Sequence, residues 1–322
     1  MLISILQKGE TFNMLDNLEK IVDFKQGENA QQGASLYKNE SSLDWEVLNG
    51  NELTYMNYLN MTTLVEILGE FYDVFATALT KSGLICGVAL GKTLVDSYSK
   101  AVDCNPIGAI DSCIGFSKIV DERTAKKIAQ SQFDLVLAIG YDKDALEILK
   151  KNEGLKIVKI NTPLEEVKIS VSQELKITPF GILEQDADRA DFKKDSFKVQ
   201  TKKKPEQEQL EDAIFAFKIA KYAKSNAVVI AKDFKTISIG QGETSFAEAC
   251  QSAMDYACDS TKDAVLATDS AFSTVDIVNA GARGRIALII EAGGTINDKK
   301  IIEQCDKDEI ALVTTGIEHF RN

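Results

Sequence analysis

Residues 133–161 read FDLVLAIGYDKDALEILKKNEGLKIVKIN, and this stretch indicates the fold class. Its first eight residues form an apolar run, residues 144–151 resemble a helix, and residues 155–161 form a second apolar run. Short continuous apolar runs are typical of strands that are buried on both faces. A helix between two of them is the pattern of a parallel βαβ unit. The stretch therefore predicts an α/β protein.

A second stretch repeats this order. Residues 286–316 read IALIIEAGGTINDKKIIEQCDKDEIALVTTG, in which an apolar run, a glycine turn, a helical segment and another apolar run follow one another. Two such units in one chain indicate an internal duplication. We expect two related α/β layers, each a mixed sheet flanked by helices.

The similarity between the two halves extends upstream of both units. In the first half we expect strands at 84–90 and 107–116, and helices at 92–102 and 121–130. In the second half we expect strands at 227–231, 236–240 and 264–268, and helices at 245–258 and 274–282.

The segments outside these units are more polar. We expect an N-terminal helix at 14–22, then a loop at 26–33 that is rich in Gly, Asn and Gln, and Trp45 and Leu48 packed against the first layer. The expected organisation is a first subdomain with the N-terminal segment (1–165), a polar linker region (166–212) and a second subdomain (213–322).

Composition excludes several classes of function. The chain has 322 residues and a formal net charge of −12, so nucleic acid would be repelled by the average field. The six cysteines show no C-x-x-C pair and are expected to be reduced. No cleavable signal and no apolar run of membrane-spanning length is present, and we expect a cytoplasmic protein. The only histidine is His319, which rules out a multi-histidine metal site, and no metal is expected.

A few polar residues stand where loops are expected to gather. Lys81 precedes an apolar strand and can stabilise developing negative charge, although most surface lysines are only solvated. Asn226 precedes another strand, where it is either a turn residue or an amide that orients a ligand. The pair Asp269 and Asp276 can cap a helix or bind an amino group. The turn ending at Thr295 can hold an anion, as can many such turns without a ligand.

Taken in order, motifs across nearly the whole chain resemble the transformylase portion of the AICAR transformylase/IMP cyclohydrolase family. The matching segments are Gly27-Glu28-Asn29 with Gln32, Leu53–Asn57, Lys81 with Cys86–Ala89, Lys224–Asn226 followed by Ile239–Gly242, Ala264–Asp276, and Thr315–Phe320.

The resemblance implies two cytidine-deaminase-like α/β layers without zinc, and a homodimer with sites at the subunit interface. The reaction it implies transfers a formyl group from 10-formyltetrahydrofolate, a co-substrate, to the 5-amino group of AICAR in purine biosynthesis. The partners it implies are thus an AICAR-like small molecule and a folate. The family's cyclohydrolase domain has no counterpart in this sequence, so we expect a stand-alone member.

Several positions that the resemblance assigns to the site keep a suitable residue. Lys81 and Asn226 correspond to catalytic positions, and Asn226 is expected to orient the carboxamide or the transition state. Lys25 stands where the family has an arginine. The remaining substrate-binding positions are Asn57, Asp134, Phe272, Asp276 and Thr295, of which Asp134 and Asp276 are expected to touch the folate or shape its pocket.

Other positions depart from the family where its chemistry takes place. Ser82 replaces the histidine that accepts the amine proton, and a serine hydroxyl is a poor base without an activating partner. Glu318 replaces a phosphate-binding arginine, which turns attraction for a phosphate into repulsion. Three interpretations stay open: an impaired or altered formyltransferase, a non-catalytic paralogue that binds a ligand or a partner, and an enzyme whose substrate lacks the phosphate.

Overall fold

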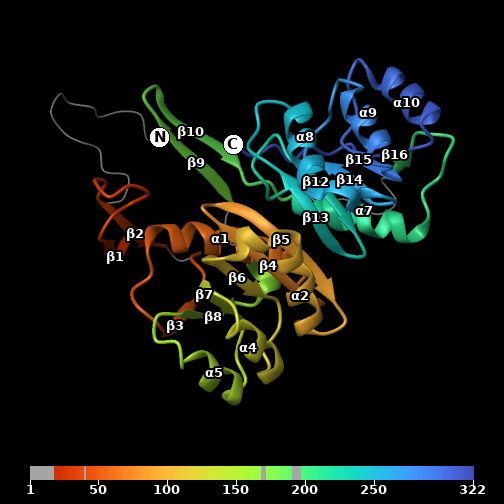
Figure 1. The fold of residues 1–322 in the computed structure, drawn as a ribbon. Coiled ribbons are helices and arrows are strands. Elements are labelled where there is room, and N and C mark those ends of the chain that lie inside the picture. The colour runs from red at the N-terminus through yellow and green to blue at the C-terminus, as the bar shows by residue number, and fades with distance from the viewer. Residues whose placement is uncertain (1–17, 40, 168–171, 191–196) are drawn as a thin grey trace.

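Two units of the same topology form most of one mixed sheet (Figure 1). The computed structural model of the chain describes residues 18–39, 41–167, 172–190 and 197–322. Within those residues the sheet has 12 strands in the order β11-β16-β15-β14-β12-β13-β5-β4-β6-β7-β8-β3. In the first half β4 pairs antiparallel with β5 and β6, and β6, β7 and β8 run parallel. In the second half β12 pairs antiparallel with β13 and β14, and β14, β15 and β16 run parallel. The duplication expected from the sequence is confirmed.

Each half begins with a short strand that pairs antiparallel at an outer edge of the sheet, and a helix follows this strand. The first half consists of β3 (Trp45–Asn49), α1 (Tyr55–Glu70), β4 (Phe75–Lys81), β5 (Leu84–Gly91), α2 (Leu94–Cys104), α3 (Pro106–Ala109), β6 (Ser112–Phe116), α4 (Glu122–Ile128), β7 (Phe133–Ala138), α5 (Lys143–Leu149) and β8 (Lys156–Ile160). The second consists of β11 (Lys198–Val199), α7 (Gln207–Ala220), β12 (Val228–Lys232), β13 (Lys235–Gly240), α8 (Phe246–Ala257), β14 (Val265–Thr268), α9 (Asp276–Arg283), β15 (Leu288–Glu291), α10 (Asp298–Lys307) and β16 (Ala311–Thr314).

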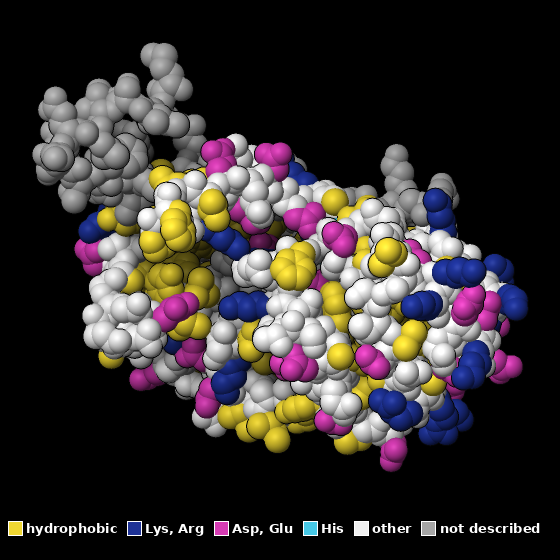
Figure 2. Space-filling model, turned by 90° about the horizontal axis from the view of Figure 1, so that it is seen from above, with side chains coloured by type: hydrophobic (Ala, Val, Ile, Leu, Met, Phe, Trp, Pro, Cys, Tyr) yellow, Lys and Arg dark blue, Asp and Glu magenta, His cyan; other side chains and the backbone are white. Residues whose placement is uncertain are grey.

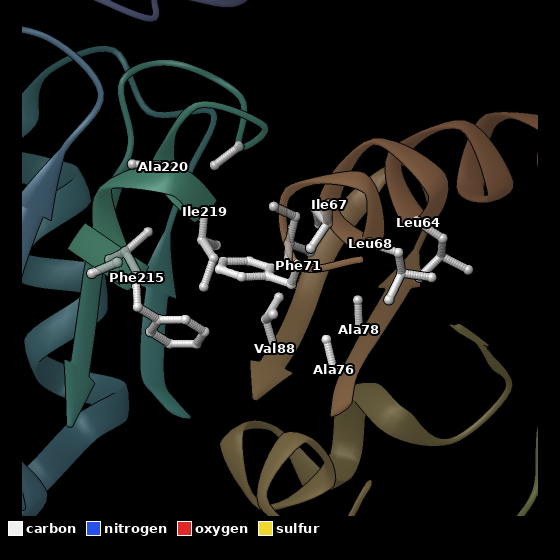
Figure 3. Packing of buried hydrophobic residues seen from close by; sticks show 14 of the residues in the cluster. Leu64, Ile67, Leu68, Phe71, Ala76, Ala78, Val88, Phe215, Ile219 and Ala220 are labelled. Carbon is white, nitrogen blue, oxygen red and sulfur yellow. The ribbon is translucent and has the colours of Figure 1, made fainter. Parts of the chain in front are cut away.

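Alternation of side chains along the strands places a hydrophobic layer on each face of the sheet. On one face, Ala76 and Ala78 of β4 and Val229 of β12 pack against α1 and α7 in one continuous core. Figure 3 shows this layer, with Leu64 and Leu68 of α1 and Phe71 just after it on one side, and side chains of α7 on the other. The rings of Phe71 and Phe215 lie 5.5 Å apart and join the two helices.

On the opposite face, the other strand residues pack against two separate groups of helices. Leu79 and Ile114 contact the cluster beneath α2, α4 and α5, whereas Val228 and Ile230 contact the cluster beneath α8, α9 and α10. Glycine allows the closest of these approaches, because a Cβ at Gly240 would collide with the carbonyl oxygen of Ala249 in α8.

The two halves meet between β5 and β13 largely through side chains. Backbone pairing is confined to one end, where Lys235 lies opposite Ala89 and the amide of Leu90 donates to Phe234. Farther along, the hydroxyl of Thr236 accepts from the amide of Val88 (2.9 Å) and donates to its carbonyl (3.1 Å). The junction is therefore one continuous sheet that is held by few main-chain bonds.

Two hairpins stand outside the sheet. The first pairs β1 (Glu19–Phe24) with β2 (Ala34–Lys38), and the second pairs β9 (Gln173–Thr178) with β10 (Gly181–Asp186). The second hairpin projects from the body and carries exposed apolar side chains, including Ile177 and Phe180 (Figure 1). No helix within the described residues is long and apolar enough to cross a membrane.

Several local expectations were wrong. The segment 14–22 was expected to be a helix, but residues 19–22 belong to strand β1, and residues 14–17 lie outside the described residues. The expected strand 107–116 begins only at Ser112, because the short helix α3 precedes it. The region expected as a polar linker contains the β9–β10 hairpin, strand β11 and the start of α7. The packing of Trp45 and Leu48 against the first layer is confirmed.

Candidate functional site

Lys81 is the last residue of β4, and Ser82 begins the turn to β5. Ser82 has a φ of 55° and Gly83 a φ of 75°, so the chain reverses through two left-handed residues. The amide of Gly83 donates to the side chain of Asn60 in α1 (2.9 Å), which fixes the turn against this helix. Lys81 donates from Nζ to the carbonyl of Ile110 (2.6 Å) and remains partly exposed. Lys81 and Ser82 are therefore neighbours at a turn that the contact with α1 fixes.

Helix α1 also positions a buried amide next to a carboxylate. The side chain of Asn57 accepts from Thr54 at the start of the helix and donates from Nδ2 to Asp134 at the start of β7 (2.6 Å). The other oxygen of Asp134 accepts from Lys156 (2.5 Å). The structure thus brings Asn57 and Asp134 together, with the amide of Asn57 engaged on both sides by the protein.

Cys113 lies beside this group and is not a candidate nucleophile. It is buried, and Asn57 Nδ2 lies 3.8 Å from its sulfur. Burial, with a smaller contribution from the charge of Asp134, raises the pKa of the thiol to about 12.

In the second half, Asn226 lies in the segment before β12. Its backbone amide and its Nδ2 both donate to the carbonyl of Glu243, at 3.1 Å and 3.0 Å. The peptide bond between Ser225 and Asn226 is cis. These contacts hold Asn226 against the loop that follows β13, and its side-chain oxygen accepts no hydrogen bond within the described residues.

Asp269 organises the same segment from the end of β14. Its carboxylate accepts from the hydroxyl of Ser225 and from the amide of Ala227 (2.8 Å). Burial raises the pKa of this carboxyl above its usual value, and the two hydrogen bonds oppose that rise. Asp269 therefore supports the backbone next to Asn226 and does not cap helix α9, which was one expectation for it.

The C-terminal residues pass alongside these groups. The carbonyl of Arg321 accepts from the amide of Ser225 (2.9 Å), and the amide of Arg321 donates to the hydroxyl of Ser225 (2.8 Å). The guanidinium of Arg321 donates to Glu66 of α1 (2.9 Å). Glu318 accepts from the hydroxyl of Ser270 (2.7 Å). A carboxylate is thus fixed in the position where the sequence resemblance places a cation.

His319 is buried in the second half. Its Nδ1 lies 2.6 Å from the carboxylate of Asp188, which follows β10, and its ring lies 5.2 Å from that of Phe217. Burial tends to raise the pKa of Asp188, but the hydrogen bond and charge of His319 hold it below the usual value. Within the described residues His319 makes no hydrogen bond to Lys81 or Ser82, so nothing in these contacts activates the serine.

The turns after β14 and β15 meet at a buried glutamate. Glu291 accepts from the amide of Phe272 (3.2 Å), and burial raises its pKa to about 7. Thr295 donates from its amide (2.8 Å) and its hydroxyl (2.5 Å) to Asp298 at the start of α10. Asp276 begins α9 and is exposed. Phe272 is therefore a residue of the hydrophobic core beneath α8, α9 and α10, and Thr295 hydrogen-bonds the first residue of α10.

The β4–β5 turn of the first half and the segment before β12 of the second half lie at the same end of the sheet. Because β13 and β5 are antiparallel, the end of β13 lies next to the start of β5. The side chain of Gln241, just after β13, donates to the carbonyl of Ile85 (2.8 Å), just after the turn with Lys81 and Ser82. Gln241 is two residues before Glu243, the partner of Asn226. Lys81, Ser82 and Asn226 therefore lie along the same edge of the sheet.

Lys25 does not join this group within one chain. It follows β1 in the first hairpin and is exposed, with no hydrogen bond or ion pair to another described residue. A search of the described residues finds no cluster of three or more His, Cys, Asp or Glu side chains suited to a metal ion.

Most contacts that build this edge were missed from sequence. Ser225 and Asp269 are 44 residues apart, Gln241 and Ile85 are 156 apart, and Arg321 and Glu66 are 255 apart. No local pattern marks such pairs, although the doubled topology indicates which strand ends meet.

Comparison with known proteins gives a consistent result. The family model described as AICARFT/IMPCHase bienzyme matches residues 2–256. Proteins called bifunctional purine biosynthesis protein PurH are similar to this chain: 34% identical over 308 residues in Thermoanaerobacter sp. (strain X514), 35% over 312 in Acetivibrio thermocellus and 36% over 309 in Brachyspira hyodysenteriae. These alignments cover 93–94% of this chain and 58–60% of each relative, so the chain spans about 60% of their length.

Proposed function

Because the chain belongs to the AICARFT/IMPCHase bienzyme family, we propose that it acts in purine biosynthesis as an AICAR formyltransferase with impaired or altered catalysis. The observation that carries the proposal is the shared edge of the sheet, where the Lys81–Ser82 turn and Asn226 are linked through Gln241. The proposed co-substrate is 10-formyltetrahydrofolate.

In the proposed reaction the 5-amino nitrogen of AICAR attacks the formyl carbon. A C–N bond forms, the bond from the formyl carbon to N10 of the folate breaks, N10 gains a proton, and the amine loses one. The ammonium of Lys81 is suited to stabilise negative charge that develops on the formyl oxygen. Asn226 has a free side-chain oxygen that can accept from the carboxamide of AICAR and hold its amine in line.

The amine proton is the weak point of this mechanism. Ser82 is the side chain next to Lys81, and a hydroxyl accepts a proton poorly without a base beside it. General base catalysis contributes roughly 10²–10⁴-fold in rate. We therefore propose slow turnover, with the proton passing to solvent or to N10 of the folate.

A homodimer is part of the proposal. It is supported by the exposed apolar side chains of the β9–β10 hairpin, such as Ile177, Phe180 and Leu183, since a lone two-stranded hairpin is only marginally stable in water. Sedimentation velocity of the full chain tests it, and a monomer at micromolar concentration contradicts it.

One observation favours a second candidate function. Glu318 is fixed by Ser270 where a phosphate would be bound in the family pattern, so the carboxylate would repel a phosphate. The negative charge of Glu318 is compatible with a formyl-transferring enzyme whose substrate is a nucleoside or a free base, because neither carries a phosphate.

The test is a formyl-transfer assay on the full chain that follows the loss of 10-formyltetrahydrofolate. It compares AICAR with the same compound lacking its phosphate, and wild type with Lys81→Met and Asn226→Ala. Turnover with AICAR that falls in both variants supports the first function, and a preference for the compound without phosphate supports the second. No turnover with either compound at saturating concentrations rejects both and leaves a non-catalytic binding protein.

A further inference from the structure

A cavity of about 340 Å³ lies between the β1–β2 hairpin, β3 and α1. This volume is at the lower end of the range for small-molecule sites. On α1 it is lined by Tyr58, Thr62 and Val65, whereas Asn57 and Asn60 of the same helix point toward the sheet and the β4–β5 turn. The cavity is thus on a different face of α1 from the proposed transformylase site. Figure 2 shows hydrophobic side chains gathered around a hollow at the end of the molecule that carries the hairpins.

Aromatic side chains form one part of the wall of this cavity, and aliphatic side chains such as Leu36 and Val65 form another. The rings of Trp45 and Tyr58 lie 5.4 Å apart at 70°, and Tyr37 contributes a third ring from β2. Phe24 packs behind Tyr58, with ring centroids 5.5 Å apart, and holds it in place. Rings arranged in this way bind another flat ring by edge-to-face or offset contacts.

The rim of the cavity carries one cation and one anion. Lys38 and Asp44 both line it and are both exposed. Within the described part of the chain neither side chain has an ion-pair partner. The backbone amide of Asp44 donates to the hydroxyl of Thr162 (2.8 Å), and this bond fixes the backbone at Asp44. An ammonium pairs with a carboxylate, and an aspartate accepts from an N–H group.

We propose that this cavity binds a planar aromatic acid of one or two rings that carries an N–H donor beside its carboxylate. The ring packs in the cavity against the Trp45–Tyr58 pair, the carboxylate pairs with Lys38, and the N–H group donates to Asp44. The site goes beyond the proposed formyl transfer and uses none of its residues, so the two can fail separately.

The chain contains a single tryptophan, and it lies in the wall of the cavity, so its emission reports binding at this place. The probe is 2-aminobenzoate, which absorbs where tryptophan emits. Titration of the full chain is expected to quench Trp45 in a saturable way. Calorimetry should show weaker binding of 2-aminobenzamide, which lacks the charge, and of benzoate, which lacks the N–H donor.

Two variants and a control locate the site. Thr62→Phe fills the cavity from the exposed side of α1 and should abolish quenching. Lys38→Ala should weaken 2-aminobenzoate about three- to fivefold and leave 2-aminobenzamide unchanged. Lys126→Ala, on the distant helix α4, should change neither. Far-UV circular dichroism checks that each variant is folded.

Three results would overturn the proposal. The first is no saturable quenching up to millimolar probe, and the second is equal affinity of wild type and Lys38→Ala for 2-aminobenzoate. The third is a shift of Trp45 emission with protein concentration alone, which would mean that a second copy of the chain occupies the cavity.

Discussion

The side chain of Gln241 makes two hydrogen bonds to the backbone of Ile85, donating to its carbonyl (2.8 Å) and accepting from its amide (3.3 Å). Gln241 follows β13 and Ile85 lies in β5, so one amide side chain takes the place of a strand pair between the two halves. It does so beside the turn that contains Ser82. The geometry of the proposed site thus depends on a side-chain bridge across the internal duplication.

Gln241→Ala should therefore destabilise the protein. The change leaves the amide and carbonyl of Ile85, which is only 3% exposed, without partners, at a cost of about 1–3 kcal/mol. Urea unfolding measures this free energy. Gln251→Ala is the matched control, because Gln251 hydrogen-bonds Asp255 on the exposed surface of α8, and a loss no larger than that of the control contradicts the bridge.

Glu291 should make stability depend on pH near neutrality. Burial raises its pKa from 4.5 to about 7 in the folded chain, so the folded state favours the protonated form. The stability that the protonated Glu291 carboxyl contributes is fully present below pH 4.5 and is lost as the pH rises through 7. Glu291→Gln stays neutral, so its stability relative to wild type should rise between pH 5 and pH 8, by at most about 3 kcal/mol.

Melting temperatures of wild type and Glu291→Gln across that pH range test this prediction. Glu303→Gln, on exposed α10, is the control and should run parallel to wild type. Parallel profiles for Glu291→Gln as well would show that the carboxyl is ionised without penalty.

Asp134→Asn should destabilise the first half. The change removes the carboxylate that accepts from Asn57 and from Lys156, whose side chain is only 12% exposed. Because Asp134 is itself 38% exposed, we expect a loss of about 1–3 kcal/mol, less than for a fully buried pair. Glu46→Gln breaks the exposed pair with Lys159 in the neighbouring strand and should cost under about 1 kcal/mol. Equal losses in the two variants would indicate that Asp134 is not a structural partner.

The parts of the fold that were predicted from sequence are those with a local signal. The parallel strands of both halves are continuous apolar runs because they are buried on both faces, as in Leu135–Ala138. Helix α1 and strand β4 were missed, since Tyr55–Glu70 is apolar on several sides and Phe75–Lys81 mixes alanine with threonine. The β9–β10 hairpin was missed because its segment was interpreted as a polar linker, although Leu175 and Ile177 alternate with polar residues along β9.

The candidate site was predicted in part for a similar reason. Lys81 and Asn226 stand at strand ends, which can be located by composition and by the family motifs. The supports of the site, such as Asp269 for Ser225, come from distant segments that only the folded chain brings together. The role of Asp269 was left open between a helix cap and a ligand contact, and its actual partners are Ser225 and Ala227.

The most direct test of the account is formyl transfer to AICAR by wild type beside the double variant Ser82→His, Glu318→Arg. Position 82 has a left-handed backbone, which histidine tolerates better than most residues, and arginine at 318 restores a phosphate-binding cation. Ser82→Asn with Glu318→Gln is the control without base or cation. We predict that kcat/KM for AICAR rises at least about tenfold in the first variant and not in the control. A folded double variant with unchanged kcat and unchanged affinity for AICAR would contradict the claim that this edge of the sheet is a transformylase site.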